Sequence, residues 1–215
     1  MTEIKSLKLD VGSTPVSAEV LVPNAMKCFF TFAHGAGANM HHVFMKEVAE
    51  ALAERGIGTL RFNFPFMEGR KGRPDVSAVA HKAVESALHK AHELYPDVPL
   101  YAAGKSFGGR MSSQFLAKHH PDFVNGLIFF GFPLHPPGKP SVERGEHLKD
   151  VKVPMLFLQG TRDELAQWDL IEQTCSALPL ATLTKIEGAD HAFKIPRQKS
   201  VPLLCDRVEE WVARQ

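Results

Sequence analysis

The sequence predicts an α/β fold with a mostly parallel central sheet of about seven or eight strands and helices on both faces. Strand-like and helix-like patterns alternate along most of the chain, which is typical of a parallel sheet. Most of the later strand-like segments are continuously apolar, as strands covered on both faces are. The 215 residues suit one domain spanning 1–215, long enough to bury a core without disulfides or metals.

The elements follow one another in a regular order after a short opening made only of strands. The first segment alternates charged and apolar residues, and the later ones are short apolar runs bounded by turn residues. We expect strands at residues 4–10, 16–22, 28–33, 58–62, 100–103, 126–130, 155–158 and 180–186. Between them, apolar residues recur at helical spacing, which predicts helices at residues 43–55, 76–94, 106–119, 165–178 and 198–214.

Three connections are longer than usual, at residues 63–75, 132–152 and 187–197, and each follows an expected strand. In an open α/β sheet, the loops that leave the carboxyl ends of the strands build the functional site. The length of these loops therefore indicates where the site lies. The middle loop is proline-rich and too short for a helical lid, so we expect no large lid.

The segment GKSFG at residues 104–108 follows an apolar run and opens a helix-like stretch. A G-x-S-x-G serine in this strand, turn and helix context is a candidate nucleophile. The glycines are needed because the sharp turn would crowd a side chain at Gly104 or Gly108. Ser106 is therefore the candidate nucleophile, and a phosphate-binding or plain turn serine is the alternative.

A serine hydroxyl needs a base within hydrogen-bond reach and a third group that holds this base in the right tautomer. His191, in the loop after the last expected strand, is the candidate base. Asp163 follows an apolar strand, so its carboxylate can reach the imidazole from the same sheet edge. Asp190 and Asp169 are the alternatives for the acid. The position of Asp163 just past the end of an apolar strand favours it, whereas Asp190 adjoins the histidine and would point elsewhere.

Acyl transfer also needs backbone donors aimed at a developing oxyanion. The segment FAHGAGAN at residues 32–39 ends a strand with small residues, whose amides can turn toward the site. We expect the Ala36 N–H and the Phe107 N–H, at the start of the helix after Ser106, to form this oxyanion hole.

For substrate binding, the candidates are Arg70, Lys105 and His135. Other basic residues lie in the same loops or flank Ser106, namely Lys71, Arg73, Arg110 and Lys139. If these side chains converge, they favour a substrate that bears a carboxylate or phosphate. The alternative is a solvated loop edge.

The composition limits the partners. Lys and Arg total 25 against 24 Asp and Glu, so the net charge of +1 provides no field for nucleic acid or an anionic membrane. The three cysteines and the eleven histidines lack metal-ligand spacing, and no metal is expected. The first residues lack the apolar core of a signal peptide. We therefore expect a cytoplasmic protein with a small-molecule acyl substrate, and leave a homodimer open.

The chain resembles the α/β-hydrolase superfamily, and more narrowly a small bacterial dienelactone-hydrolase-like group related to a eukaryotic chromatin-complex subunit and a testis-expressed protein. The resemblance spans nearly the whole chain, and its most specific parts are GKSFGGRM from Gly104 and FPLHPPGKP from Phe132. It implies the α/β-hydrolase fold, a triad of Ser106, Asp163 and His191, and hydrolysis without a cofactor. True dienelactone hydrolases use a cysteine nucleophile, whereas this chain has a serine.

Together these features predict a serine hydrolase that cleaves a small soluble carboxylic ester or thioester through an acyl-enzyme. Two alternatives remain open: a catalytically silent scaffold for protein interaction, and an amide or peptide hydrolase.

Overall fold

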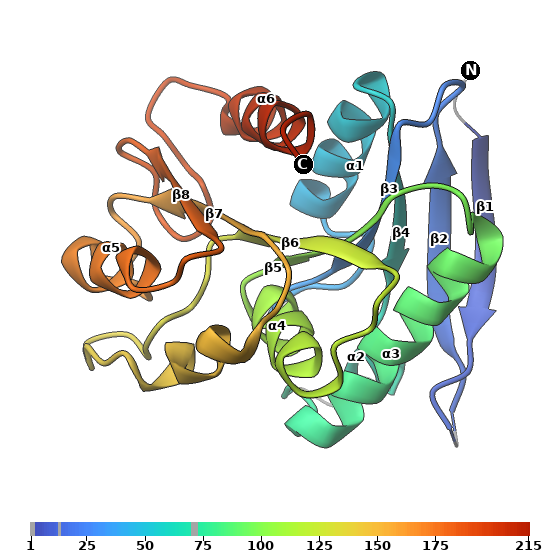
Figure 1. The fold of residues 1–215 in the computed structure, drawn as a ribbon, viewed down its shortest axis with the longest axis horizontal. Coiled ribbons are helices and arrows are strands. Elements are labelled where there is room, and N and C mark those ends of the chain that lie inside the picture. The colour runs from blue at the N-terminus through green and yellow to red at the C-terminus, as the bar shows by residue number, and fades with distance from the viewer. Residues whose placement is uncertain (1–2, 13, 70–72) are drawn as a thin grey trace.

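The computed structural model describes residues 3–12, 14–69 and 73–215, and its centre is an eight-stranded sheet (Figure 1). The strands lie in the order β1-β2-β4-β3-β5-β6-β7-β8. Their bounds are β1 (Glu3–Leu9), β2 (Val16–Val22), β3 (Cys28–Ala33), β4 (Ile57–Phe62), β5 (Leu100–Lys105), β6 (Val124–Phe130), β7 (Met155–Gly160) and β8 (Ala181–Ile186).

The sheet has an antiparallel edge and a parallel remainder. β1 pairs with β2 and β2 with β4 in antiparallel register, while every pair from β4 to β8 is parallel. The expected mostly parallel sheet is thus confirmed, and the opening strands form its antiparallel edge. Because β3 to β8 all run in one direction, the loops after them emerge at one edge of the sheet.

Helices cover both faces, as expected (Figure 1). On one face lie α1 and α6, and on the other lie α3, α4 and α5. The helix bounds are α1 (Val43–Glu54), α2 (Pro65–Glu68), α3 (Ser77–Leu94), α4 (Phe107–His119), η1 (Glu143–Asp150), α5 (Trp168–Ser176) and α6 (Ser200–Val212).

Two expectations about local structure need correction. The helix expected at 165–178 begins only at Trp168, because Ala166 N–H turns back to the Asp163 carbonyl and Leu165 O accepts from His135 N–H. The long loops also contain structure, since α2 lies within 63–75 and the 3-10 helix η1 within 132–152. Both are short, so they carry little periodic signal in the sequence.

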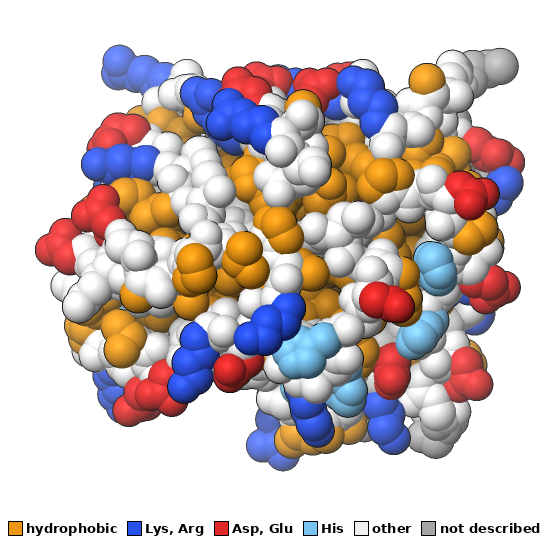
Figure 2. All heavy atoms as spheres, viewed as in Figure 1, with side chains coloured by type: hydrophobic (Ala, Val, Ile, Leu, Met, Phe, Trp, Pro, Cys, Tyr) orange, Lys and Arg blue, Asp and Glu red, His pale blue; other side chains and the backbone are white. Residues whose placement is uncertain are grey.

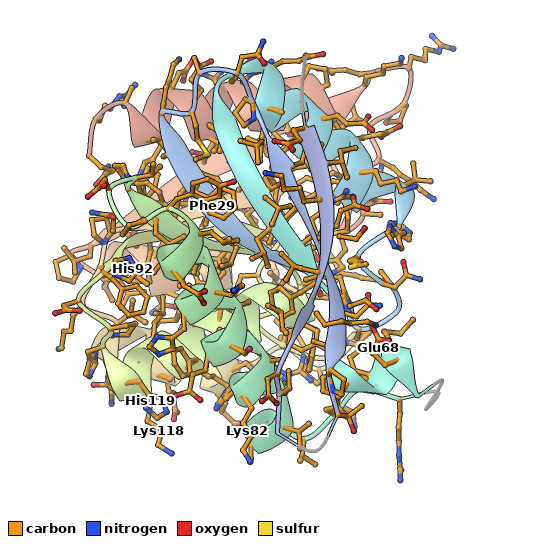
Figure 3. All side chains as sticks on the ribbon, turned by 90° about the vertical axis from the view of Figure 1, so that its right-hand side faces the viewer. Phe29, Glu68, Lys82, His92, Lys118 and His119 are labelled. Carbon is orange, nitrogen blue, oxygen red and sulfur yellow. The ribbon has the colours of Figure 1, made fainter. Side chains whose placement is uncertain are left out.

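The core consists of two apolar layers, one on each face of the sheet. Alternation along β3 sends Phe29 toward the α3 face and Phe30 toward the α1 face, and both side chains are fully buried. Figure 3 shows Phe29 between the sheet and α3, where its ring lies 4.8 Å from that of Tyr95. These layers fix the strands that carry the site loops.

The face of the molecule drawn in Figure 2 carries charges of both signs. On the face that Figure 2 shows, basic and acidic side chains lie interspersed around the rim, while hydrophobic side chains lie across the middle. Within the ranges that the structure describes, we find no helix with the length and apolar content needed to cross a bilayer.

Candidate active site

Ser106 lies at the sharp turn between β5 and α4. Its backbone has φ 51° and ψ −113°, a left-handed conformation that a non-glycine residue rarely adopts. Gly108 makes the turn fit, because a Cβ there would collide with the Ala33 carbonyl at the end of β3. The GKSFG segment therefore forms the strained turn expected from the sequence, with the serine hydroxyl held at the end of the sheet.

His191 joins Ser106 to Asp163 through its two ring nitrogens. Its Nε2 lies 2.8 Å from Ser106 Oγ, and its Nδ1 lies 2.7 Å from Asp163 Oδ2. An ionised carboxylate only accepts hydrogen bonds, so the imidazole proton lies on Nδ1 and Nε2 is free to accept the serine proton. The structure thus brings together the three residues that the sequence singled out.

Asp163 is held by a set of buried donors. Its side chain is only 1% exposed, and besides His191 it accepts from Gln159 Nε2 at 2.6 Å and Leu165 N–H at 2.8 Å. Gln159 is itself fixed, since its Oε1 accepts from Phe132 N–H at 2.9 Å. Sequence reasoning missed this glutamine. The available signal was an amide at the end of the otherwise apolar run MLFLQG.

Among the described residues, neither alternative acid is hydrogen-bonded to the His191 ring. Asp190 Oδ1 accepts from the N–H groups of Ala192 and Lys194, so its carboxylate closes its own turn. Asp169 lies in the first turn of α5, and among the described residues it makes no hydrogen bond to His191.

The loop after β8 must pass closely over β7 to bring His191 to this position. Arg162 N–H donates to Ala189 O at 2.9 Å, and Thr161 N–H donates to Ile186 O at 3.1 Å. Gly160 permits the approach, because a Cβ there would collide with the Ala189 carbonyl. The acid and the histidine therefore come from two loops that are hydrogen-bonded to each other.

The loop expected to form the oxyanion hole lies beside Ser106. A Cβ at Gly35 would lie 3.8 Å from Ser106 Cβ. His34 fixes the loop, since its Nε2 accepts from Phe64 N–H at 3.0 Å and its Nδ1 therefore donates to Gly35 O at 2.8 Å. Burial lowers the pKa of His34 to about 4, which keeps the ring neutral.

The direction of the Ala36 N–H follows from this bond. In a trans peptide the N–H points opposite to the preceding carbonyl. Gly35 O faces His34 and Ala38 N–H, so the Ala36 N–H points away from that turn. Phe107 N–H starts α4 directly after Ser106. Both expected donors thus belong to backbone turns next to the serine.

The expected substrate residues are placed differently. His135 is 2% exposed, and both ring nitrogens are used inside the protein: Nε2 accepts from Gln167 N–H, and Nδ1 donates to Pro136 O. It is thus a buried structural histidine that joins two loops, which corrects the expectation of a substrate contact. Arg70 lies outside the described residues, as does Lys71.

The basic side chains do not converge in the described part of the chain. Lys105 Nζ donates to the His191 carbonyl at 2.6 Å, so it is engaged inside the protein rather than open to a substrate. Arg73 and Lys139 are exposed, and Arg110 is half-buried on α4. Two charged residues that the sequence did not single out, Arg162 and Glu164, line a hollow of about 430 Å³ together with Asp190, His191 and Ala192.

Across the described ranges, no three histidine, cysteine or acidic side chains are grouped so that they could hold a metal ion. The three cysteines are buried, and burial raises the pKa of each thiol to about 12. They are therefore poor nucleophiles.

Comparison with known proteins agrees with this architecture. A family model described as "Alpha/beta hydrolase domain" matches residues 26–212. Dienelactone hydrolase from Anabaena variabilis has a TM-score of 0.77 and 21% identity, covering 99% of this chain and 98% of that chain. A serine hydrolase without lid from Xanthomonas campestris has a TM-score of 0.78 and 24% identity, covering 99% and 94%. At these identities the similarity shows the fold alone.

Curated relatives from Mycobacterium tuberculosis carry "phosphoribosyl transferase" in their names. They are 26% identical over 212 residues, which is 94% of this chain and 45% of the relative. The chain thus spans less than half the length of the curated relatives it matches.

Proposed function

This protein belongs to the alpha/beta hydrolase family, and we propose that it is a serine hydrolase that cleaves a small soluble carboxylic ester or thioester. One observation carries the proposal: the continuous hydrogen-bonded chain from Ser106 Oγ through His191 to the buried Asp163 carboxylate. This arrangement activates a hydroxyl for attack on an acyl carbon.

In the first half-reaction, His191 Nε2 accepts the proton as Ser106 Oγ attacks the acyl carbonyl carbon. Asp163 stabilises the resulting imidazolium without taking its proton. The N–H groups of Ala36 and Phe107 stabilise the negative charge on the former carbonyl oxygen. When the tetrahedral species collapses, His191 returns the proton to the leaving alcohol or thiol and the acyl group remains on Ser106.

In the second half-reaction, water replaces the leaving group. His191 accepts a proton from this water as its oxygen attacks the acyl-enzyme, and the proton then passes to Ser106 Oγ as the acid departs. The same three residues therefore complete the cycle. The hollow beside His191, lined by Arg162 and Glu164, is the proposed path for water and leaving group.

The names of the mycobacterial relatives assign no activity to these residues. More than half of each relative lies outside the match, since only 45% is covered. A name given to the whole of such a protein describes more than the part that this chain shares. Hydrolysis is the chemistry that the Ser106, His191 and Asp163 arrangement supports.

The test is labelling of the purified protein by a fluorophosphonate probe, together with hydrolysis of p-nitrophenyl acetate and butyrate. We expect the wild type to be labelled and to hydrolyse these esters. Ser106→Ala should abolish labelling and lower kcat at least about 10³-fold. Ser176→Ala, which removes an exposed serine on α5, is the matched control and should behave as the wild type.

A folded wild type that is neither labelled nor active would overturn the proposal in favour of the silent scaffold. Hydrolysis of matched anilides at rates equal to those of the esters would replace the ester reading by amide cleavage. Labelling that persists in Ser106→Ala would show that another residue is the nucleophile.

A further inference from the structure

Lys105 is the last residue of β5, directly before Ser106. Side chains alternate between the faces of a strand, and Tyr101 and Ala103 of β5 pack into the layer beneath α1 and α6. Lys105 occupies the next position of this series. A lysine thus continues a row of buried apolar side chains, at the point where the strand reaches the site.

The ammonium group lies between the histidine loop and α1. Its Nζ donates to the His191 carbonyl at 2.6 Å. It also lies 5.3 Å from the ring centre of Phe193 and 6.0 Å from that of Phe44. These two rings stack on each other at 5.9 Å with an interplanar angle of 9°, so they join α1 to the loop that carries His191.

In the described part of the chain, Lys105 has no carboxylate within ion-pair distance. The charged groups that face it are Asp163 and Asp190, from the loops after β7 and β8. Both carboxylates are engaged elsewhere, Asp163 with His191 and Asp190 with its own turn. Burial lowers the pKa of Lys105 to about 8, so an ammonium at this position costs folding free energy at neutral pH.

The histidine loop needs such an anchor because of the sheet order. His191 follows β8, while Ser106 follows β5, three strand spacings away, or roughly 14 Å at about 4.8 Å per strand. The turn that carries His191 is closed on itself by Phe193 N–H donating to Asp190 O at 2.9 Å. Phe193 has a φ of 60°, a strained conformation for an aromatic residue, and its ring is 2% exposed.

We propose that Lys105 is a positioning residue, which fixes the backbone of His191 through its carbonyl and so keeps the imidazole within reach of the Ser106 hydroxyl. Because Lys105 and Ser106 are neighbours in the chain, one strand end holds both the serine and the loop of its base. The inference rests on the proposed function, since it concerns the geometry of that reaction.

The primary test is Lys105→Met, which keeps the length and apolar part of the side chain and removes the ammonium. We expect kcat for p-nitrophenyl acetate and the rate of fluorophosphonate labelling to fall about 10- to 100-fold, the size of effect that a displacement near 1 Å causes. KM should stay within about twofold, because no substrate contact is removed. Tm at pH 7 should be unchanged or higher, unlike that of a variant that merely loses structure.

Lys118→Met is the matched control, since Lys118 is an exposed lysine on α4. It should leave kcat, KM and labelling at wild-type values. A Lys105→Met protein with wild-type kcat would overturn the inference while leaving the proposed function intact. If the wild type itself is neither labelled nor active, the proposed function fails and this inference falls with it.

Lys105→Gln supplies an independent test, which also serves if the Lys105→Met protein does not fold. Its amide is a neutral donor on a shorter side chain, so kcat should lie between those of Lys105→Met and the wild type. The downfield Nδ1–H resonance of His191 should shift or broaden in both variants, reporting the altered contact with Asp163. A glutamine variant with wild-type kcat and an unmoved resonance would contradict the inference.

Discussion

Two buried cationic side chains of this protein, Arg61 and Lys105, have different surroundings. Arg61, in β4, is 3% exposed and forms an ion pair with Glu19 of β2, and its NH1 group also donates to Met40 O at 3.2 Å. Lys105, in β5, has a carbonyl and two aromatic rings around it, and its nearest charged groups are bonded elsewhere. Arg61 thus has a carboxylate partner of its own, whereas the hydrogen-bond partner of Lys105 is a neutral carbonyl.

The difference indicates what each residue does. A buried cation with its own carboxylate joins two strands, and removal of either partner leaves the other charge buried and unpaired. Removal of Lys105 leaves only a carbonyl without its donor, and also removes a buried charge that has no carboxylate within ion-pair distance in the described part of the chain. Arg61 therefore joins β4 to β2 in the antiparallel edge, whereas Lys105 holds the loop that carries His191.

The largest expected effect is on folding, from Arg61→Met. It should lower the free energy of unfolding by about 3 kcal/mol, because Glu19, whose side chain is only 15% exposed, then loses the guanidinium beside it. Urea unfolding at neutral pH measures this. Arg55→Met is the control: Arg55 pairs with Asp206, whose side chain is 53% exposed, so the loss should stay below about 1 kcal/mol. Equal losses of unfolding free energy in the two variants would contradict the expected difference between a buried and an exposed ion pair.

A smaller effect is expected in the pH dependence of stability. Burial lowers the pKa of Lys105 from 10.5 to about 8. Between these two values the unfolded chain binds more protons than the folded protein, so wild-type stability rises with pH relative to Lys105→Met. The relative gain should be on the order of 2 kcal/mol by about pH 10. Urea unfolding of both proteins across this range measures it, and parallel curves would mean that the lysine titrates normally.

The smallest effect is expected from Phe44→Leu, which removes one of the two rings beside the ammonium. Loss of the ring stacking and of the contact with Lys105 should cost about 1 kcal/mol of stability and lower kcat about two- to threefold. Phe123→Leu is the control. Phe123 is also half-buried, and its ring centre lies 4.6 Å from that of His92, on which it stacks; this pair is not part of the site. It should lose similar stability and keep its kcat. A matching loss of kcat in both variants would mean that Phe44 has no special coupling to the site.

Much of the site could be predicted because its parts have local signatures. The turn glycines around Ser106 are required by backbone sterics, and that requirement is visible in the sequence. Asp163 and His191 were found because each follows a strand, and strands of a parallel sheet end at one edge. The preference for Asp163 over Asp190 is also a local inference; in the structure Asp163 contacts the His191 ring, and Asp190 accepts from the backbone of its own turn.

The supporting contacts could not be predicted in the same way. His135 lies in a proline-rich loop typical of a binding site, yet its ring joins Pro136 to Gln167, which is 32 residues away in the chain. Gln159 holds both Asp163 and Phe132 N–H, and nothing in a six-residue strand pattern says which groups its amide will meet. The hydrogen-bond partners of a buried polar side chain come from distant parts of the chain, whereas the periodicity of the sequence indicates only which face of a strand or helix the side chain occupies.

The sequence alone predicts the α/β architecture, an opening made only of strands, and the order of serine, acid and histidine. These follow from apolar periodicity and turn chemistry, which act over a few residues. That Lys105 turns inward to the His191 carbonyl, and not outward to a substrate, follows only from the three-dimensional packing. That choice depends on a loop 86 residues further along the chain, whose path over β7 is set by the packing of the whole sheet.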